Sequence, residues 1–187
     1  MKNFIEFKDM ILINFTDMNE EEQDKVLSMR NDKRIRRWMV NDKVITREEH
    51  KAFMDALKTD TTNHYFLVKR NEYNGVVSLN RYDSYNRRAY LGIYANPDLS
   101  GKGAGTACMQ VLLYLAFEVF GLHTLKLEVI SDNIRAIQLY EKFGFEREGC
   151  FKDYLHRNSS WQDMLVMGLN ENFYQKNQMK LDENNAN

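Results

Sequence analysis

Cysteine and proline are scarce in this chain of 187 residues, which contains two cysteines and one proline. Cys108 falls inside an expected helix and Cys150 near an expected strand, so the count argues against a disulfide framework and fits a reducing compartment. The four histidines, at positions 50, 64, 123 and 156, are scattered through the chain. Because no metal-ligand spacing links them, we expect no metal cofactor.

Net charge and long apolar runs are also lacking. The 26 basic and 27 acidic residues give a formal net charge of −1, so the chain has no overall attraction for nucleic acid or for an anionic membrane. No apolar stretch reaches the length of a membrane span, and the N-terminus lacks the apolar region of a signal peptide. We therefore expect a soluble, cytoplasmic protein with neither a nucleic-acid nor a membrane partner.

The composition that remains is that of one globular domain. Hydrophobic residues make up 43% of the chain, which supports a core in a single domain over residues 1–174. Residues 175–187 are polar and rich in Asn, so we expect a disordered tail. Apolar periodicity predicts an α/β protein with helices after Thr16 or Asn19, after Thr46, from about Gly103 and after Asn133. The expected strands are 10–15, 64–70, 75–82, 89–95, 122–130, 145–150 and 161–168.

A glycine-rich turn joins one of these strands to the most apolar helix. The strand Leu91 to Ala95 runs through Pro97 into a loop that contains Gly101, Gly103 and Gly105. Helix N-termini offer unpaired amides, and glycine lets an anion come close to them, so the turn can hold a phosphate. It is not a P-loop, because no Gly-Lys-Ser/Thr ending follows, and its alternating glycines do not match the dinucleotide-binding pattern.

A second motif begins at the next helix. Asn133 can offer its side-chain amide to a peptide-like ligand, and Tyr140 lies two turns further along the same face. A tyrosine hydroxyl with a pKa near 10 can give a proton to a leaving thiolate of comparable basicity. The structural alternative is that Asn133 only caps the helix and that Tyr140 is a core aromatic.

Together the two motifs resemble the GNAT family of acetyl-CoA-dependent N-acetyltransferases. Asn133, Ala136, Tyr140, Gly144 and Phe145 match all marked positions of its Asn-x-x-Ala-x-x-x-Tyr-x-x-x-Gly-Phe signature, whereas Ser100 stands where the glycine loop of the family carries Gln or Arg. The resemblance implies a mixed, mostly antiparallel sheet that is splayed in the middle and flanked by helices. The residues implied to bind acetyl-CoA are Ile93, Tyr94, Gly101, Lys102, Gly103, Ala104, Gly105, Thr106, Asn133, Ala136 and Tyr140.

The resemblance also implies how the site works. The strand before the glycine loop is expected to carry a bulge and to splay from the strand Leu125 to Ile130, so that pantetheine lies in the gap. Backbone groups near Ile93 and Tyr94 would then polarise the thioester carbonyl, and Tyr140 would be the general acid. Glu128 is a candidate general base, with deprotonation through water as an equal alternative.

A further set of segments lies outside the coenzyme motifs: Arg30-Asn31, Trp38-Met39, His50, the strand Tyr65-Phe66-Leu67, Gly75-Val76 and especially Leu91 to Pro97. In these segments the chain is similar to the PseH-type enzymes of pseudaminic acid biosynthesis. These acetylate the 4-amino group of a UDP-linked aminodideoxy sugar on the route to flagellin glycosylation. Asn80 and Arg81 stand where we expect Thr and Lys. The alternatives are a polyamine or ribosomal-protein N-acetyltransferase and a non-catalytic acetyl-CoA sensor. Because GNAT enzymes are often dimers, the resemblance also allows a homodimer. The acceptor pocket implied by the resemblance consists of Arg30, Trp38, His50, Asn80, Arg81 and Tyr94.

Overall fold

The structure is built on one eight-stranded sheet. The computed structural model describes residues 4–157 and 159–176. The strand order is β1-β2-β3-β4-β5-β6-β8-β7, and every neighbouring pair is antiparallel except β5 and β6. The strands are β1 (Phe4–Phe7), β2 (Met10–Asn14), β3 (His64–Lys69), β4 (Tyr73–Asp83), β5 (Arg88–Ala95), β6 (Thr124–Ile130), β7 (Glu146–Arg157) and β8 (Ser160–Asn170).

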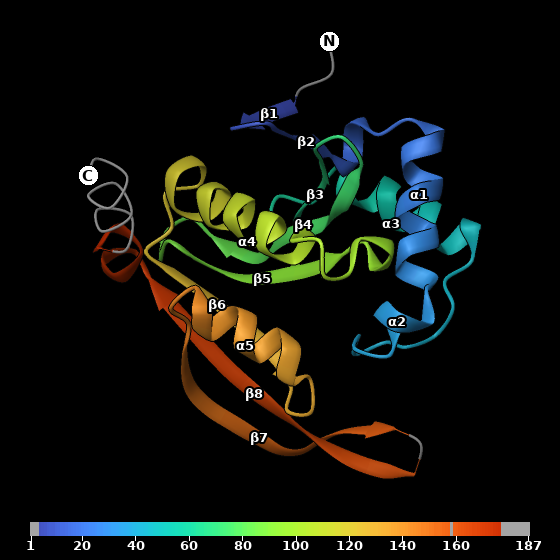
Figure 1. Ribbon diagram of the computed structural model, residues 1–187. Coiled ribbons are helices and arrows are strands. Elements are labelled where there is room, and N and C mark those ends of the chain that lie inside the picture. The colour runs from blue at the N-terminus through green and yellow to red at the C-terminus, as the bar shows by residue number, and fades with distance from the viewer. Residues whose placement is uncertain (1–3, 158, 177–187) are drawn as a thin grey trace.

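Helices cover both faces of this sheet (Figure 1). On one face, α4 and α5 pack against β4, β5, β6 and β8 in the larger apolar core. On the other face, α1 and α3 pack over β2, β3 and β4 in a second core. The helices are α1 (Glu20–Asn31), α2 (Lys33–Arg36), α3 (Arg47–Leu57), α4 (Ala104–Tyr114) and α5 (Ile134–Lys142). No helix in the described part of the chain is long and apolar enough to cross a membrane.

Local side-chain caps set several helix boundaries. Asn19 and Glu22 form a capping box at α1, and Thr46 and Glu49 form another at α3. Asp32 divides the basic stretch that follows α1, because its side chain accepts a hydrogen bond from the Arg34 N–H at 2.7 Å and begins α2. The expected long apolar helix is α4, and it passes at Leu115–Val119 into a π-helical turn.

The two ends of the sheet differ from the sequence prediction. The seven expected strands are present, but an eighth, β1, pairs with β2 through Phe4 and Ile13. The β7–β8 hairpin is longer than expected, and β7 is an edge strand that is exposed along most of its length. It therefore lacks the alternation of buried and exposed residues on which strand prediction relies.

The first two residues of the predicted tail are helical. Residues 171–176 form a helical turn that includes Gln175 and Lys176, and Tyr174 belongs to the larger core. The rest of the predicted tail, residues 177–187, lies outside the described residues.

Replacing the two glycines at the start of α4 by alanine is expected to have opposite effects on stability. Gly103 has a φ of +84°, where a Cβ costs roughly 1–2 kcal/mol, so Gly103→Ala is expected to lower the free energy of unfolding by about that amount. Gly105 is helical and its Cβ would meet only Leu139 Cδ2, at 3.6 Å. Gly105→Ala is therefore expected to raise the free energy of unfolding by about 0.5 kcal/mol. Urea unfolding of both variants measures the difference, and shifts of the same sign would contradict it.

Candidate active site

The sheet opens between β5 and β6, as predicted. These strands pair only over three positions, the last of which joins Tyr90 to Lys126. Beyond it β5 stays paired with β4 as far as Ala95, and β6 stays paired with β8 as far as Ile130. The two halves of the sheet therefore diverge, as Figure 1 shows, and leave inner strand edges that no strand of the described residues pairs with.

Backbone groups of β5 are available at this opening. The Asn96 N–H donates to the Asn74 carbonyl at 2.7 Å, and the register between β4 and β5 continues without a shift from Ala95 to Tyr90. Because hydrogen-bonded pairs alternate along an antiparallel ladder, the N–H and C=O groups of Ile93 point into the opening. Those of Tyr94 are directed to β4.

The bulge expected in β5 lies in β4 instead. Two residues of β4, Arg81 and Tyr82, stand between the pairs Asn80–Tyr90 and Asp83–Arg88, so the extra residue belongs to β4. Arg81 has a φ of +51°, which is unusual for a residue with a side chain. The pairing of two residues of β4, Arg81 and Tyr82, with one residue of β5 explains this backbone conformation. Bulges often redirect side chains next to functional sites.

The glycine loop forms an open helix N-terminus on the α4 side of the sheet. Gly103 caps α4 without a side-chain hydrogen bond, and the Ala107 N–H makes the bond to the Gly103 carbonyl at 2.9 Å. The N–H groups of Ala104, Gly105 and Thr106 precede that bond and have no partner within the helix. The Lys102 N–H differs, because it donates to the Leu99 carbonyl at 3.0 Å.

The second motif lies on α5, on the same face of the sheet. The Asn133 side-chain oxygen accepts a hydrogen bond from the Ala136 N–H at 3.3 Å, so this side chain does cap the helix. Tyr140 is buried with an exposed fraction of 7%, and its ring lies edge-on to Phe145 at 5.9 Å between centroids. Burial raises the pKa of the Tyr140 hydroxyl above its ordinary value. Gly144, with φ of +90°, ends the helix.

The opposite face carries arginines beside an aromatic side chain. Burial lowers the pKa of the Arg30 guanidinium, against the opposing effect of nearby Tyr94, and the charge of Arg36 lowers it further. Burial raises the pKa of the Tyr94 hydroxyl, while Arg30 acts to lower it. Arg30 Nη1 and Arg36 Nε are buried and have no hydrogen-bond partner among the described residues. Arg30, next to Tyr94, and Arg36, near Arg30, are therefore two cations that each keep one unpaired buried donor within the described structure.

Arg81 and Glu128 meet across the opening. Arg81 Nη1 lies 3.7 Å from Glu128 Oε1, and its guanidinium carbon lies 4.9 Å from the centre of the Tyr90 ring. Nearby, Asn80 Nδ2 donates to Ser78 Oγ at 3.0 Å, while Asn80 Oδ1 is buried without a partner in the described structure. Gly92 is needed opposite them, because a Cβ there would stand 2.4 Å from Ser78 Oγ.

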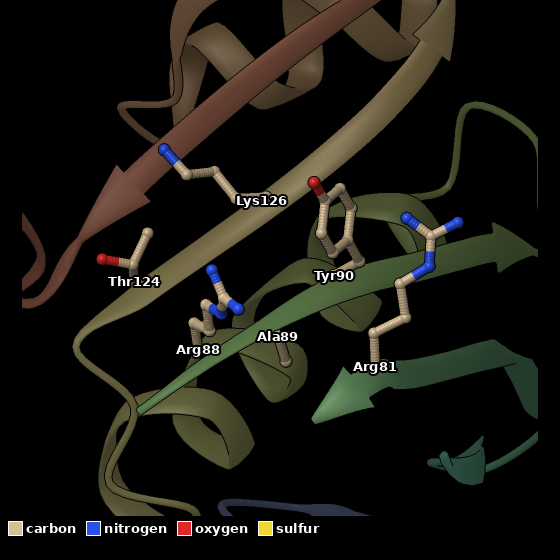
Figure 2. Close-up of a pocket in the computed structure, with 6 residues that line it drawn as sticks. All are labelled: Arg81, Arg88, Ala89, Tyr90, Thr124 and Lys126. Carbon is tan, nitrogen blue, oxygen red and sulfur yellow. The ribbon is translucent and has the colours of Figure 1, made fainter. Parts of the chain in front are cut away.

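A pocket of about 270 Å³ lies at the closed end of the opening, where β5 and β6 still pair. Figure 2 shows Arg88 and Lys126 on the two strands that border it, with the Lys126 side chain extended toward β8. Lys126 forms an ion pair with Glu148, and Arg88 with Asp83. Of the predicted acceptor residues, Arg81 lines this pocket. Its full lining is Arg81, Arg88, Ala89, Tyr90, Thr124 and Lys126.

Two predicted acceptor residues have other surroundings. His50 lies in α3 with an exposed fraction of 7%. Burial lowers the pKa of its imidazole, and Asp24 on α1 acts in the opposite direction. Trp38 follows α2, and the Arg37 guanidinium stacks on its ring at 4.6 Å. The contacts of His50 thus place it in the packing between α1 and α3, whereas Trp38 lies in the turn after α2.

That turn is held by an arginine that the sequence analysis did not find. Arg157, at the end of β7, donates to the carbonyls of Arg37 at 2.6 Å, of Val40 at 3.3 Å, and of Met39. Its Nε lies 3.4 Å from Asp42 Oδ2, and its side chain is only 11% exposed. Arg30 donates to the Asn41 carbonyl in the same turn at 2.5 Å. No local pattern around residue 157 indicates this contact, because its partners are more than a hundred residues away.

Comparisons with known proteins agree with this geometry. Residues 13–146 match the family described as the acetyltransferase (GNAT) domain. The acetyltransferase PseH of Campylobacter jejuni is 34% identical over 146 residues, which are 78% of this chain and 90% of that protein. The spermidine N(1)-acetyltransferase of Escherichia coli is 29% identical over 116 residues, 62% of each protein.

Solved structures are similar to the chain over most of its length. The Campylobacter jejuni N-acetyltransferase PseH in complex with acetyl coenzyme A has a TM-score of 0.66 at 26% identity, covering 87% of this chain and 99% of that one. The spermidine N-acetyltransferase of Vibrio cholerae, with CoA and spermine, has a TM-score of 0.82 at 22% identity. That match covers 89% of this chain and 98% of the other, and it shows a shared fold.

Removal of the Arg157 guanidinium is expected to loosen the turn at 37–42. Arg157→Ala should lower the free energy of unfolding by about 2 kcal/mol, because several hydrogen bonds to a charged group are lost. Arg147→Ala is the control, since Arg147 forms an exposed ion pair with Glu141 at 2.9 Å and such pairs contribute about 0–1 kcal/mol. Urea unfolding and amide hydrogen exchange of residues 37–42 measure the effect. Equal losses in the two variants would contradict it.

Proposed function

The chain belongs to the GNAT family of acetyltransferases and uses acetyl-CoA, and we propose that it acetylates the 4-amino group of a UDP-linked aminodideoxy sugar. This reaction would place it on the route to pseudaminic acid and flagellin glycosylation, as a cytoplasmic enzyme with one catalytic domain over residues 1–174. The observation that supports the proposal is the pair Arg30 and Arg36, because Arg30 Nη1 and Arg36 Nε are buried without a hydrogen-bond partner among the described residues. Paired guanidinium groups suit a diphosphate, and the likeness to PseH supports the same acceptor.

Acetyl-CoA is assigned to the opening between β5 and β6. The free amides of Ala104, Gly105 and Thr106 would receive the pyrophosphate, assisted by Gly101, Lys102 and Gly103. Pantetheine would lie along β5, where the Ile93 N–H points into the opening and is suited to polarise the thioester carbonyl. Asn133 and Ala136 would line the same arm, with the Asn133 side-chain nitrogen left available by its cap.

Acetyl transfer then needs a proton donor and a proton acceptor. The amine attacks the thioester carbonyl, the C–S bond breaks, and the departing sulfur takes a proton from the Tyr140 hydroxyl. Burial raises the pKa of that hydroxyl, so it stays protonated at neutral pH. Glu128 is the proposed base, because it lies at the mouth of the opening on the acceptor face; a water is the alternative carrier of the ammonium proton.

The acceptor would occupy the face opposite α4 and α5. In this assignment Arg30 binds the diphosphate, while Arg81, Asn80 and Tyr94 contact the sugar. Trp38 offers a flat surface in the turn that Arg157 holds. His50 would line the same acceptor pocket, because its Nε2 is buried without a hydrogen-bond partner among the described residues.

A polyamine is the second candidate acceptor. The similarity to spermidine acetyltransferases favours it. A polycation needs carboxylates, however, and the charged group that acts on the Tyr94 hydroxyl is the Arg30 guanidinium. Around Arg30 itself, the cation Arg36 opposes the single carboxylate Asp42 among the described residues. A ribosomal-protein peptide is a third acceptor to test. A non-catalytic acetyl-CoA sensor would not need the proton donor that Tyr140 can supply.

An acceptor panel separates these functions. Free thiol release from acetyl-CoA is followed with a UDP-4-amino sugar, spermidine and a ribosomal-protein peptide, and the same UDP sugar already acetylated at the 4-amino group gives the background of hydrolysis. Release above this background is expected with the UDP-4-amino sugar. Release with spermidine alone would refute the nucleotide-sugar assignment, and tight coenzyme binding without release would favour the sensor.

Tyr140→Phe tests the proton donor. The ring and its packing against Phe145 are kept, so we expect the affinity for acetyl-CoA to change by less than about threefold, while kcat falls by about a hundredfold or more. Tyr154→Phe is the control, because Tyr154 is 54% exposed on β7. Equilibrium binding and steady-state kinetics give the two quantities. An unchanged kcat would remove Tyr140 from the role of general acid.

A further inference from the structure

Arg135 connects α5 to the glycine loop. It is the second residue of α5, and its Nη1 donates a hydrogen bond to Ser100 Oγ at 2.8 Å. Ser100 ends the short 3₁₀ turn that leads into the loop, and both side chains are exposed. Ser100 is the position at which the chain departs from the Gln or Arg of the family pattern. A guanidinium from another helix is therefore adjacent to the place where the pattern has a longer polar side chain.

The charge of Arg135 is not balanced within the described structure. No carboxylate of the described residues lies within ion-pair distance of it, although Asp132 is close in sequence. The first turn of α5 contains no acidic residue, and a cation at a helix N-terminus is disfavoured by the helix dipole. Asp98, the acid in the adjoining turn, is engaged by Arg34 at 2.8 Å. The position thus suits an anion from outside the chain.

We propose that Arg135 binds the pyrophosphate of the coenzyme and replaces, from α5, the side chain that Ser100 lacks. The inference rests on the proposed placement of acetyl-CoA at the glycine loop. A guanidinium has five N–H donors, of which the bond to Ser100 uses one. Because Ser100 Oγ accepts from Arg135, its own hydroxyl proton remains available to a phosphate oxygen. The two side chains together would add a charged contact to the backbone amides at the start of α4.

Coenzyme fragments test the proposal without any acceptor. Equilibrium binding of CoA, of dephospho-CoA and of pantetheine is measured with the full chain and with Arg135→Ala. We expect CoA and dephospho-CoA, which share the pyrophosphate, to bind about tenfold more weakly to the variant, whereas pantetheine binding is unchanged. Raising the salt concentration should reduce the difference, since the lost contact is ionic.

Two further variants identify the contact. Ser100→Arg combined with Arg135→Ala should recover most of the affinity, because it places the guanidinium on the loop itself. Arg147→Ala is the control, since this exposed arginine also contacts α5, through Glu141, and should bind CoA as the unaltered protein does. Urea unfolding of each variant shows whether the fold is kept.

Three results would overturn the proposal. Unchanged affinity of Arg135→Ala for CoA would show that Arg135 does not contact the coenzyme. A loss confined to CoA, with dephospho-CoA unaffected, would assign Arg135 to the 3′-phosphate. An equal loss with pantetheine would show a general distortion of the site. Because no acceptor is present, a failure of the proposed sugar acetylation would leave these binding results intact, and the two proposals can fail separately.

Discussion

The pairing between β5 and β6 stops after Tyr90 and Lys126. The candidate site depends on this early stop, because it opens the sheet. Unpaired backbone groups inside a sheet are costly unless another partner satisfies them. Here the ladder from β4 holds one strand and the ladder from β8 holds the other, so the opening persists although its inner edges are unpaired. These edges offer main-chain donors and acceptors at fixed spacing, which is what an extended, amide-containing ligand can use.

The two groups of candidate site residues lie on opposite faces of the sheet around this opening. The helix N-terminus at Gly103 and the motif on α5 lie on one face, and the arginines beside Tyr94 lie on the other. The faces are joined at their border by Arg34, which pairs with Asp98 next to the glycine loop and with Asp32 at the start of α2. One exposed guanidinium thus connects the coenzyme loop with the helix that leads to Trp38.

Features set by local chemistry could be predicted from the sequence. The helix starts expected after Thr46 and Asn133 are confirmed, because both side chains cap the helices that follow them. The splayed sheet followed from the family resemblance and is confirmed. For the helix starts, the signal lies within a few residues of the feature that it specifies, because caps are made by neighbouring backbone and side-chain groups.

Features that depend on distant partners could not be predicted in this way. Arg157 and Arg135 look like ordinary surface arginines until the fold brings Met39 and Ser100 to them. The bulge expected in β5 lies in β4. Which of two paired strands carries the extra residue depends on their register, and the register is set by contacts between segments. Strand β1 is short and half exposed, so it becomes recognisable only through its pairing with β2. For the candidate site residues, the positions of the motifs could be predicted from the sequence, whereas the residues that contact them are known only from the fold.

The exposed edge strand β7 has a consequence for how the protein behaves at high concentration. A long free edge can template the addition of strands from other molecules, which is a route to aggregation. On β7 charged side chains are frequent, and the ladder with β8 shifts register twice, between Arg147 and Gly149 and between Phe151 and Leu155. These shifts interrupt the regular row of hydrogen-bonding groups that an added strand would need. The hairpin can therefore extend from the body of the molecule to support the turn after α2 without offering a continuous template for polymerisation.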